Sequence, residues 1–137
     1  MRTLKSIDLA EARQIIEDGL RQAAVDGGKP VVIAVSDHSG DLVAFARMDG
    51  APVRSVRLAI NKAYTAARVL STTAALAVRL KEEGRDVLVY GDPAFSLFPG
   101  GAPLKAGEAT IGAVGISGRA AEEDQELADR IAVLRPG

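Results

Sequence analysis

Lys62 is the residue of this sequence whose type and position most clearly suggest chemistry. On a helical wheel it lies outside the polar face of its predicted helix, next to side chains that are small or apolar: Ser55, Leu58, Ala59 and Ala66. A lysine in that place either extends its ammonium to solvent along the apolar surface or lies partly buried at a pocket. At a pocket it could bind an anion or, with a lowered pKa, serve as a base.

Asp124 shows a similar conflict between residue type and position. It precedes Leu127, Ala128 and Ile131 by three, four and seven residues, which places it on the buried side of the last predicted helix. Its place in the first turn also favours an acid, because the positive end of the helix dipole lies there. The sharper hypothesis is that Lys62 and Asp124 form a pair that lines a pocket.

The other polar residues exclude several kinds of catalytic site. His38 is the only histidine, which excludes a multi-histidine metal site; its predicted turn, 37–41, favours a solvated side chain. The chain has no cysteine, so it has no thiolate nucleophile, thiolate metal ligand or disulfide. No clustered D-x-D arrangement is present either, and we expect no metal site. Arg47 and Met48 end a predicted strand and either complete it or reach a site.

The segment 92–118 is rich in proline and glycine. Gly112, Gly115 and Gly118 lie within or just after a predicted strand, where glycine marks a bulge or a close approach by a ligand or another backbone. We interpret this segment as one wall of a small-molecule site, which supplies shape and backbone amides rather than ionisable groups.

Length and composition predict a single domain with a real hydrophobic core. The chain has 137 residues, of which 47% are hydrophobic, and a formal net charge of −1. This balance gives no electrostatic footprint for nucleic acid or for an anionic membrane. No apolar run is long enough to span a bilayer and no signal peptide is evident, so we expect a cytoplasmic protein.

Hydrophobic spacing and turn residues predict the first half of the fold. A helix begins after Asp8, with Glu11 as the acidic partner of its cap, and ends at 27–28. Strands at 30–35 and 42–46 follow. A second helix begins near residue 53 with an apolar stripe of Val53, Val56, Ile60, Ala63, Ala67 and Leu70. Its weaker apolar side, which includes Lys62, indicates a helix covered on two sides, by the sheet and by another subunit or helix.

The second half of the chain predicts a further hairpin and two helices. A third helix follows Ser71 or Thr72, and the local pattern favours a strand at 86–90. Strands 104–106 and 109–117 form a hairpin, and the last helix buries Leu127, Ile131 and Leu134. The order α-β-β-α-α-(β)-β-β-α predicts an α+β fold, in which helices pack on an antiparallel sheet.

Several short motifs, taken together and in order, carry a resemblance that runs nearly from end to end. They are the segments 33–37 with Gly40, 44–50, 62–66, 99–103 and 111–118, and Glu122 with Asp124. With these motifs the chain resembles the GlcG/HbpS-like family, which is similar to the C-terminal domain of PduO-type cobalamin adenosyltransferases. The resemblance implies one domain over 1–137 with a profilin-like antiparallel sheet flanked by helices. It also implies homo-oligomers, a haem or corrinoid ligand, and a loop rather than a strand at 86–90.

Two positions depart from the pattern that the resemblance implies. In the haem-binding branch a threonine after the paired glycines is a proposed iron ligand, whereas this chain has Ala102, which cannot coordinate iron. The family's second glycine after the last strand is Arg119 here. Its cation would either meet a carboxylate ligand or cap the surface.

The first hypothesis is a non-catalytic binding protein, an accessory or sensor protein for a haem-like tetrapyrrole or another carboxylate-bearing small molecule. The anionic groups of the ligand would meet side chains and amides from several segments: Arg47, Lys62, Arg119 and the backbone of Gly100 and Gly101.

Two other hypotheses remain open from the sequence. One is a small enzyme of isomerase or hydratase type that acts on an organic acid, with Lys62 as base or electrostatic catalyst and Asp124 as its partner. The other is a purely structural subunit of an oligomer, which would have no pocket.

Overall fold

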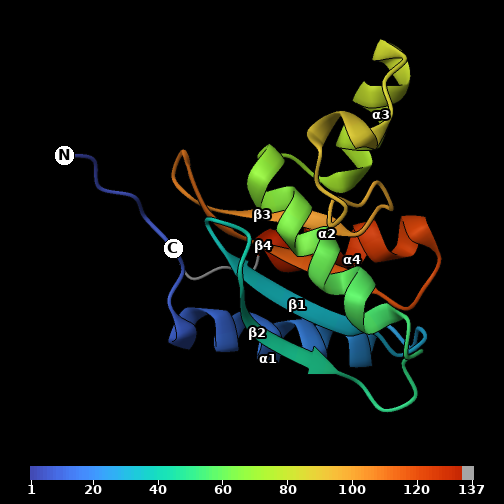
Figure 1. The fold of residues 1–137 in the computed structure, drawn as a ribbon. Coiled ribbons are helices and arrows are strands. Elements are labelled where there is room, and N and C mark those ends of the chain that lie inside the picture. Colours follow the sequence, from blue (N-terminus) through green and yellow to red (C-terminus); the bar gives the residue numbers. More distant parts are fainter. Residues whose placement is uncertain (134–137) are drawn as a thin grey trace.

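The computed structural model describes residues 1–133 (Figure 1). Its α-helices are α1 (Leu9–Val25), α2 (Ser55–Val69), α3 (Thr73–Glu83) and α4 (Ala121–Val133). Its strands are β1 (Val32–Asp37), β2 (Leu42–Arg47), β3 (Gly101–Ala106) and β4 (Ala109–Ser117). A short 3-10 helix, η1 (Val87–Tyr90), lies between α3 and β3.

The strands form one antiparallel sheet in the order β2-β1-β4-β3. Two hairpins, β1 with β2 and β3 with β4, are joined through the pairing of β1 with β4, in which Val32 faces Ser117 and Asp37 faces Gly112. The predicted α+β fold, an antiparallel sheet flanked by helices, is confirmed.

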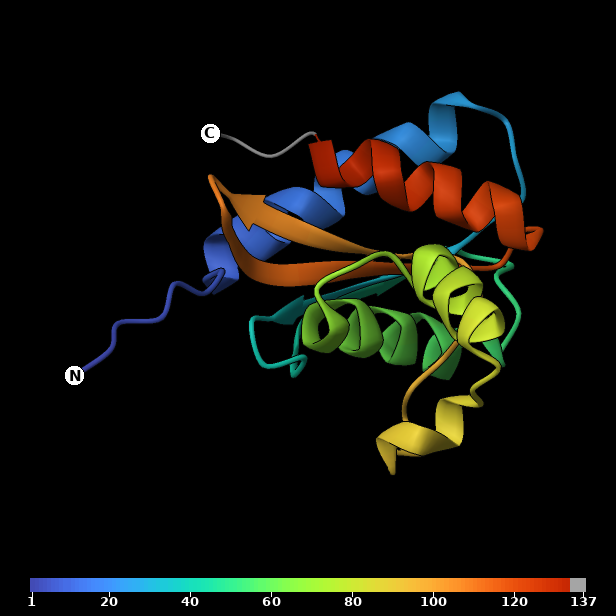
Figure 2. The same cartoon turned by 90° about the horizontal axis from the view of Figure 1, so that it is seen from above.

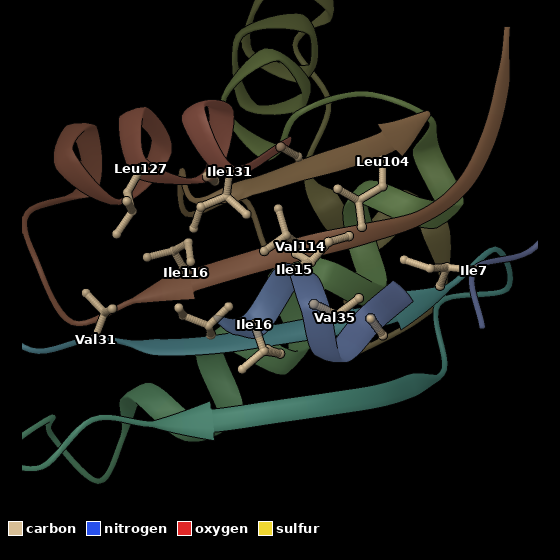
Figure 3. Close-up of a cluster of buried hydrophobic side chains, with 14 of the residues drawn as sticks. Ile7, Ile15, Ile16, Val31, Val35, Leu104, Val114, Ile116, Leu127 and Ile131 are labelled. Atoms are coloured by element: carbon tan, nitrogen blue, oxygen red, sulfur yellow. The ribbon is translucent and has the colours of Figure 1, made fainter. Parts of the chain in front are cut away.

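Helices cover both faces of the sheet (Figure 2). α1 and α4 lie side by side on one face, where large aliphatic side chains such as Ile15, Val114, Ile116, Leu127 and Ile131 form the main core (Figure 3). α2 lies on the other face, and α3 extends away from the edge strand β3 (Figure 1). The predicted cap of α1 is present, since the carboxylate of Asp8 accepts the N–H of Glu11 at 2.8 Å and the carboxylate of Glu11 accepts the N–H of Asp8.

The face of α2 that meets the sheet consists of small residues. Ala59, Ala63 and Ala66 are buried against Ala34 and Ala113 of the sheet. A Cβ at Gly115 of β4 would lie 2.0 Å from the carbonyl oxygen of Ala59, so only glycine allows α2 this close. Gly115 therefore serves helix packing rather than a ligand.

The predicted apolar stripe of α2 is only partly the buried face. Val53 and Leu70, at its two ends, are exposed, whereas Ala59 and Ala66 from the weaker side are fully buried. Val53 precedes α2 and Leu70 is its C-cap residue, with a left-handed φ of 60°, so neither lies on the face of the helix that meets the sheet.

Part of the outer side of α2 is covered by the segment 91–98 of the same chain, and the predicted cover by another subunit stays a prediction. The hydroxyl oxygen of Thr65 accepts the N–H of Ser96 at 2.9 Å, and the hydroxyl of Tyr64 donates to the carboxylate of Asp92. The rings of Tyr64 and Phe95 meet edge to face, with their centroids 5.8 Å apart.

The prediction of a strand at 86–90, which the local pattern favours, is wrong. The carboxylate of Asp86 accepts the N–H of Leu88 at 2.9 Å, and Gly91 has a φ of +65°, so the segment closes into a 3-10 turn. No residue of η1 is buried, which removes the packing that a strand would need. The expected burial of Leu134 lies outside the described residues.

Candidate functional site

Lys62 and Asp124 form a buried ion pair between α2 and α4. The Nζ atom of Lys62 lies 3.2 Å from Oδ2 of Asp124 and donates a second hydrogen bond, of 2.8 Å, to the carbonyl oxygen of Ile116. The exposed fractions of the two side chains are 3% and 4%. Because an ammonium has three N–H donors, one remains beyond the two that these described residues accept. The pair hypothesised from helical position is present.

The start of α4 holds the carboxylate of Asp124 in place. Its second oxygen, Oδ1, accepts the backbone N–H of Arg119 at 3.0 Å. The carboxylate of Glu123 accepts the N–H of Ala120 at 3.1 Å and so caps the helix. Acidic residues in the first turn also lie at the positive end of the helix dipole.

Burial shifts both members of the pair toward their neutral forms. Desolvation lowers the pKa of Lys62 and raises the pKa of Asp124, and in each case the attraction of the partner opposes the shift. The site thus combines an amine and a carboxyl group whose charged states are both disfavoured by their surroundings.

Gly100 and Gly101 bring the start of β3 against Lys62. A Cβ at Gly100, where φ is +136°, would lie 2.9 Å from Nζ of Lys62 and 2.5 Å from the carbonyl oxygen of Ile116. A Cβ at Gly101 would lie 2.5 Å from the carbonyl oxygen of Lys62. The paired glycines therefore form part of the wall beside the lysine.

The amides of these glycines are bound within the protein. The N–H of Gly100 donates to Oε1 of Gln125 at 2.7 Å, and the N–H of Gly101 donates to the hydroxyl of Thr73 at 2.9 Å. Gln125 also donates from Nε2 to the carbonyl oxygen of Gly101 at 3.0 Å. The structure therefore gives these glycines a packing role, and their N–H groups are already engaged within the protein.

A pocket of about 250 Å³ lies beside the ion pair. It is bounded by the start of α2, the end of β4, the start of α4 and the segment before β3: Arg54, Ser55, Leu58, Lys62, Phe98, Ser117, Gly118, Arg119, Ala121 and Asp124. Of the three glycines of β4 and its exit, Gly118 is the one that lines it. Arg54 and Lys62 together outweigh the charge of Asp124, so the pocket favours an anion.

A second, larger pocket of about 500 Å³ adjoins the first. It is lined mainly by apolar side chains of α2, η1 and the segment before β3: Leu58, Asn61, Val87, Phe95, Ser96, Leu97 and Phe98. Leu58 and Phe98 line both pockets. We call the two pockets together the α2 groove; it has a cationic end at Lys62 and an apolar end at Phe95.

The two other predicted cations are not used in the same way. The guanidinium of Arg119 is bound to the carboxylate of Asp26, with Nη1 2.6 Å from Oδ2, although Arg119 borders the cationic pocket. Its guanidinium is thus engaged within the protein, and the contact with a carboxylate ligand stays a prediction. Arg47 is exposed on the edge strand β2 and lines neither pocket.

The family model described as haem-degrading protein HbpS-like matches residues 7–132. The chain belongs to the HbpS-like family. A curated relative is 33% identical over 128 residues, which cover 92% of this chain and 89% of that protein; it is an uncharacterised 15.0 kDa protein encoded between dhaT and dhaS of Citrobacter freundii.

Solved structures agree with the HbpS-like assignment over the length of the chain. Protein ORFY of Klebsiella pneumoniae superposes with a TM-score of 0.84 at 30% identity, covering 97% of this chain and 92% of that one. A double mutant of HbpS from Streptomyces reticuli gives 0.88 at 26% identity, covering 100% and 92%. A complex of PduOC with heme gives 0.82 at 25% identity, covering 93% and 94%.

The α2 groove of this HbpS-like chain does not fit axial ligation of haem iron. The usual protein ligands are His, Cys, Met and Tyr, and the described residues that line the groove include none of these. His38, Met48, Tyr64 and Tyr90 all lie outside both pockets. Ala102 is buried, with an exposed fraction of 2%, in the core on the other side of the sheet.

Sequence reasoning missed Arg54 and Gln125. Arg54, Leu58 and Lys62 are spaced by four residues and all line the cationic pocket, so the i, i+4, i+8 spacing was a usable signal. Gln125 had no such signal, because most of its partners are distant in sequence, among them the N–H groups of Ala74 and Gly100.

None of the helices in residues 1–133 combines the length and the apolar character that crossing a membrane requires.

Proposed function

We propose that this HbpS-like protein is a binding protein for an amphiphilic carboxylate, which it holds in the α2 groove. The observation that carries the proposal is the junction at Leu58 and Phe98, where an apolar pocket of about 500 Å³ meets a cationic pocket of about 250 Å³. The combined volume of the two pockets lies within the size range of small-molecule sites, roughly 300–1,000 Å³. A ring system would occupy the apolar end, and its carboxylates would meet Arg54 and Lys62.

A haem-like tetrapyrrole is the ligand class that we favour. It combines a large apolar ring with two carboxylates at one edge, which matches the two ends of the groove. The family description and the heme complex of PduOC point to the same class. A corrinoid carries mostly amides at its periphery and would gain less from two cations.

Recognition by ring and carboxylates predicts that iron contributes little to affinity. Haemin and iron-free protoporphyrin should therefore bind with similar dissociation constants. Absorbance titration of the purified protein with each compound tests this. A haemin affinity far above that of protoporphyrin would indicate an iron ligand and contradict the proposal, as would the absence of binding by both.

Matched arginine variants locate the site. Arg54 lines the cationic pocket, whereas Arg57 lies on the same helix, is exposed and lines neither pocket. A hydrogen bond to a charged group contributes about 1.5–3 kcal/mol, so we expect Arg54→Ala to weaken binding at least tenfold. Arg57→Ala should leave binding unchanged, and equal effects of the two variants would place the ligand elsewhere.

A second candidate function, a small enzyme acting on an organic acid, is favoured by the lowered pKa of Lys62. The neutral amine would take a proton from a substrate carbon and return it at another, with Arg54 binding the carboxylate. Lysine NMR titration tests this function, because a base must be partly neutral near working pH. A Lys62 that titrates at the ordinary value of 10.5 would exclude it.

We also propose that the protein forms homo-oligomers. Leu88, Val89 and Phe98 are exposed near the apolar end of the groove, and apolar side chains gathered at a surface often mark an interface. Sedimentation analysis should show a dimer or larger species; a monomer at micromolar concentration would contradict this.

A further inference from the structure

The guanidinium of Arg119 is almost completely bonded within the protein. Nη1 and Nη2 donate to the two oxygens of Asp26 at 2.6 and 2.8 Å. Nε donates to the carbonyl oxygen of Lys29 at 2.8 Å, and Nη2 also donates to that of Ala23 at 3.1 Å. These contacts fix the end of α1 and the loop after it to the turn between β4 and α4.

Gly28 provides the space that the guanidinium needs. A Cβ at this position would lie 2.5 Å from Cζ of Arg119, and Gly28 itself donates its N–H to the carboxylate of Asp26 at 2.9 Å. The neighbouring Gly27 has open space around its Cβ position. The loop is therefore shaped around the arginine at Gly28 specifically.

The turn held by this arginine is also the turn that holds Asp124. The backbone N–H of Arg119 donates to Oδ1 of Asp124 at 3.0 Å, which leaves Oδ2 toward the ammonium of Lys62 at 3.2 Å. One residue thus binds Asp26 with its side chain and Asp124 with its main chain.

We propose that Arg119, fixed by Asp26, is a positioning residue for the Lys62–Asp124 pair. The Asp26–Arg119 contact determines where the backbone N–H of Arg119 lies, and this N–H determines how the carboxylate of Asp124 is oriented toward Lys62. This role deepens the proposed function, because it would keep one N–H of Lys62 directed at the ligand. The charged groups that face Asp124 are Lys62 on α2, Arg119 in the turn and, across the pocket, Arg54.

Carbon-13 NMR titration of the Asp124 carboxyl group, without ligand, separates positioning from simple charge effects. The signal is identified by its absence in Asp124→Asn. The hydrogen bond from the backbone N–H of Arg119 helps to lower the pKa of Asp124, so displacement of this N–H should raise that pKa. Asp26→Asn removes a negative charge, which by charge alone would lower the pKa of Asp124. We expect a rise, and a fall or no change would overturn the proposal.

Arg130→Ala is the matched control for Asp26→Asn. Nη2 of Arg130 also contacts the carboxylate of Asp26, at 3.1 Å, but Arg130 contacts neither Asp124 nor Lys62 in the described structure. Removing this positive charge would raise the pKa of Asp124 if only charge mattered. We expect no change, and a rise equal to that of Asp26→Asn would overturn the proposal.

A second pair of variants leaves every charge in place. Gly28→Ala displaces the guanidinium and should raise the pKa of Asp124, whereas Gly27→Asn, at a left-handed residue that asparagine tolerates, should not. An unchanged pKa of Asp124 in a folded Gly28→Ala protein would contradict the positioning role of Arg119. Protoporphyrin binding by the same variants is read separately. A raised pKa of Asp124 together with unchanged protoporphyrin affinity would support the positioning role and count against the proposed ligand site.

Discussion

Nζ of Lys62 lies 3.2 Å from Oδ2 of Asp124, although the two residues are 62 positions apart and belong to helices on opposite faces of the sheet. The ammonium also binds the carbonyl oxygen of Ile116, so the pair bridges the two helical layers at the end of β4. A charge pair in this place costs desolvation free energy, and it adjoins the cationic pocket.

Removing one member of the pair should destabilise the protein more than removing both. Lys62→Met leaves the buried carboxylate of Asp124 without its counter-ion, and we expect a loss of about 3 kcal/mol or more at neutral pH. The double variant Lys62→Met/Asp124→Asn removes the unpaired negative charge, and the side-chain oxygen of asparagine can still accept the N–H of Arg119. Urea unfolding should therefore find the double variant more stable than Lys62→Met. A double variant that is less stable would show that the two residues contribute independently.

Asp26 and Asp124 should affect acid stability with opposite signs. The hydrogen bond from Arg119 lowers the pKa of Asp26, so its stabilisation is present above pH 3.8 and is lost as pH falls through the lower native value. Burial raises the pKa of Asp124, so the native state binds the extra proton between 3.8 and the raised value. Its contribution therefore grows more favourable as pH falls through that window.

Unfolding measured from neutral pH to about pH 3 tests both signs. Relative to the unmodified protein, Asp26→Asn should be least stable near neutral pH, and the deficit should shrink in acid. Asp124→Asn should lose the gain that the unmodified protein makes in the Asp124 window. Parallel pH curves for all three proteins would contradict the two pKa shifts.

The contact between β4 and α2 should not tolerate a methyl group. In Gly115→Ala the new Cβ would meet the carbonyl oxygen of Ala59 at 2.0 Å, so the helix must move and we expect a loss of about 1–3 kcal/mol in the free energy of unfolding. Gly107→Asn is the control, because Gly107 has open space and a left-handed φ of +63° that asparagine tolerates. Equal midpoints of urea unfolding would show that the sheet and α2 can separate freely.

Arg47 and Lys62 are both predicted to bind the ligand, but only Lys62 lines the α2 groove. Their variants should therefore differ in affinity for the ligand. Arg47→Ala should leave protoporphyrin affinity unchanged, since Arg47 lines neither pocket. Lys62→Met should lower affinity at least tenfold, because it removes the ammonium group at the cationic end. Fluorescence titration with protoporphyrin measures both, and a larger loss for Arg47→Ala would move the site to the edge of β2.

Much of the fold follows from local sequence signals. The cap at Asp8, the turns at 37–41 and 107–108, and the apolar runs of the central strands define the element order without tertiary information. The strand expected at 86–90 fails because β-branched residues alone do not make a strand. The segment pairs with no strand of the described sheet, and Asp86 closes the turn locally.

The buried face of α2 and the partners of Arg119 could not be predicted from the sequence, because they depend on contacts between segments that are distant along the chain. Alanine and glycine became the contact because two backbones approach closely at Gly115, which reverses the usual preference for larger apolar residues. Arg119 is tied to Asp26, 93 residues earlier in the chain. Helical position did identify Lys62 and Asp124, because a charge on an apolar face can be recognised from spacing alone.

Equilibrium titration with iron-free protoporphyrin and with its dimethyl ester tests the central claim most directly. The two compounds share the ring, but the ester has no carboxylate for Arg54 and Lys62 to bind. We predict that the free acid binds at least about tenfold more tightly than the ester, and that Lys62→Met and Arg54→Ala each reduce this difference. Equal affinity for acid and ester would contradict recognition of a carboxylate in the α2 groove.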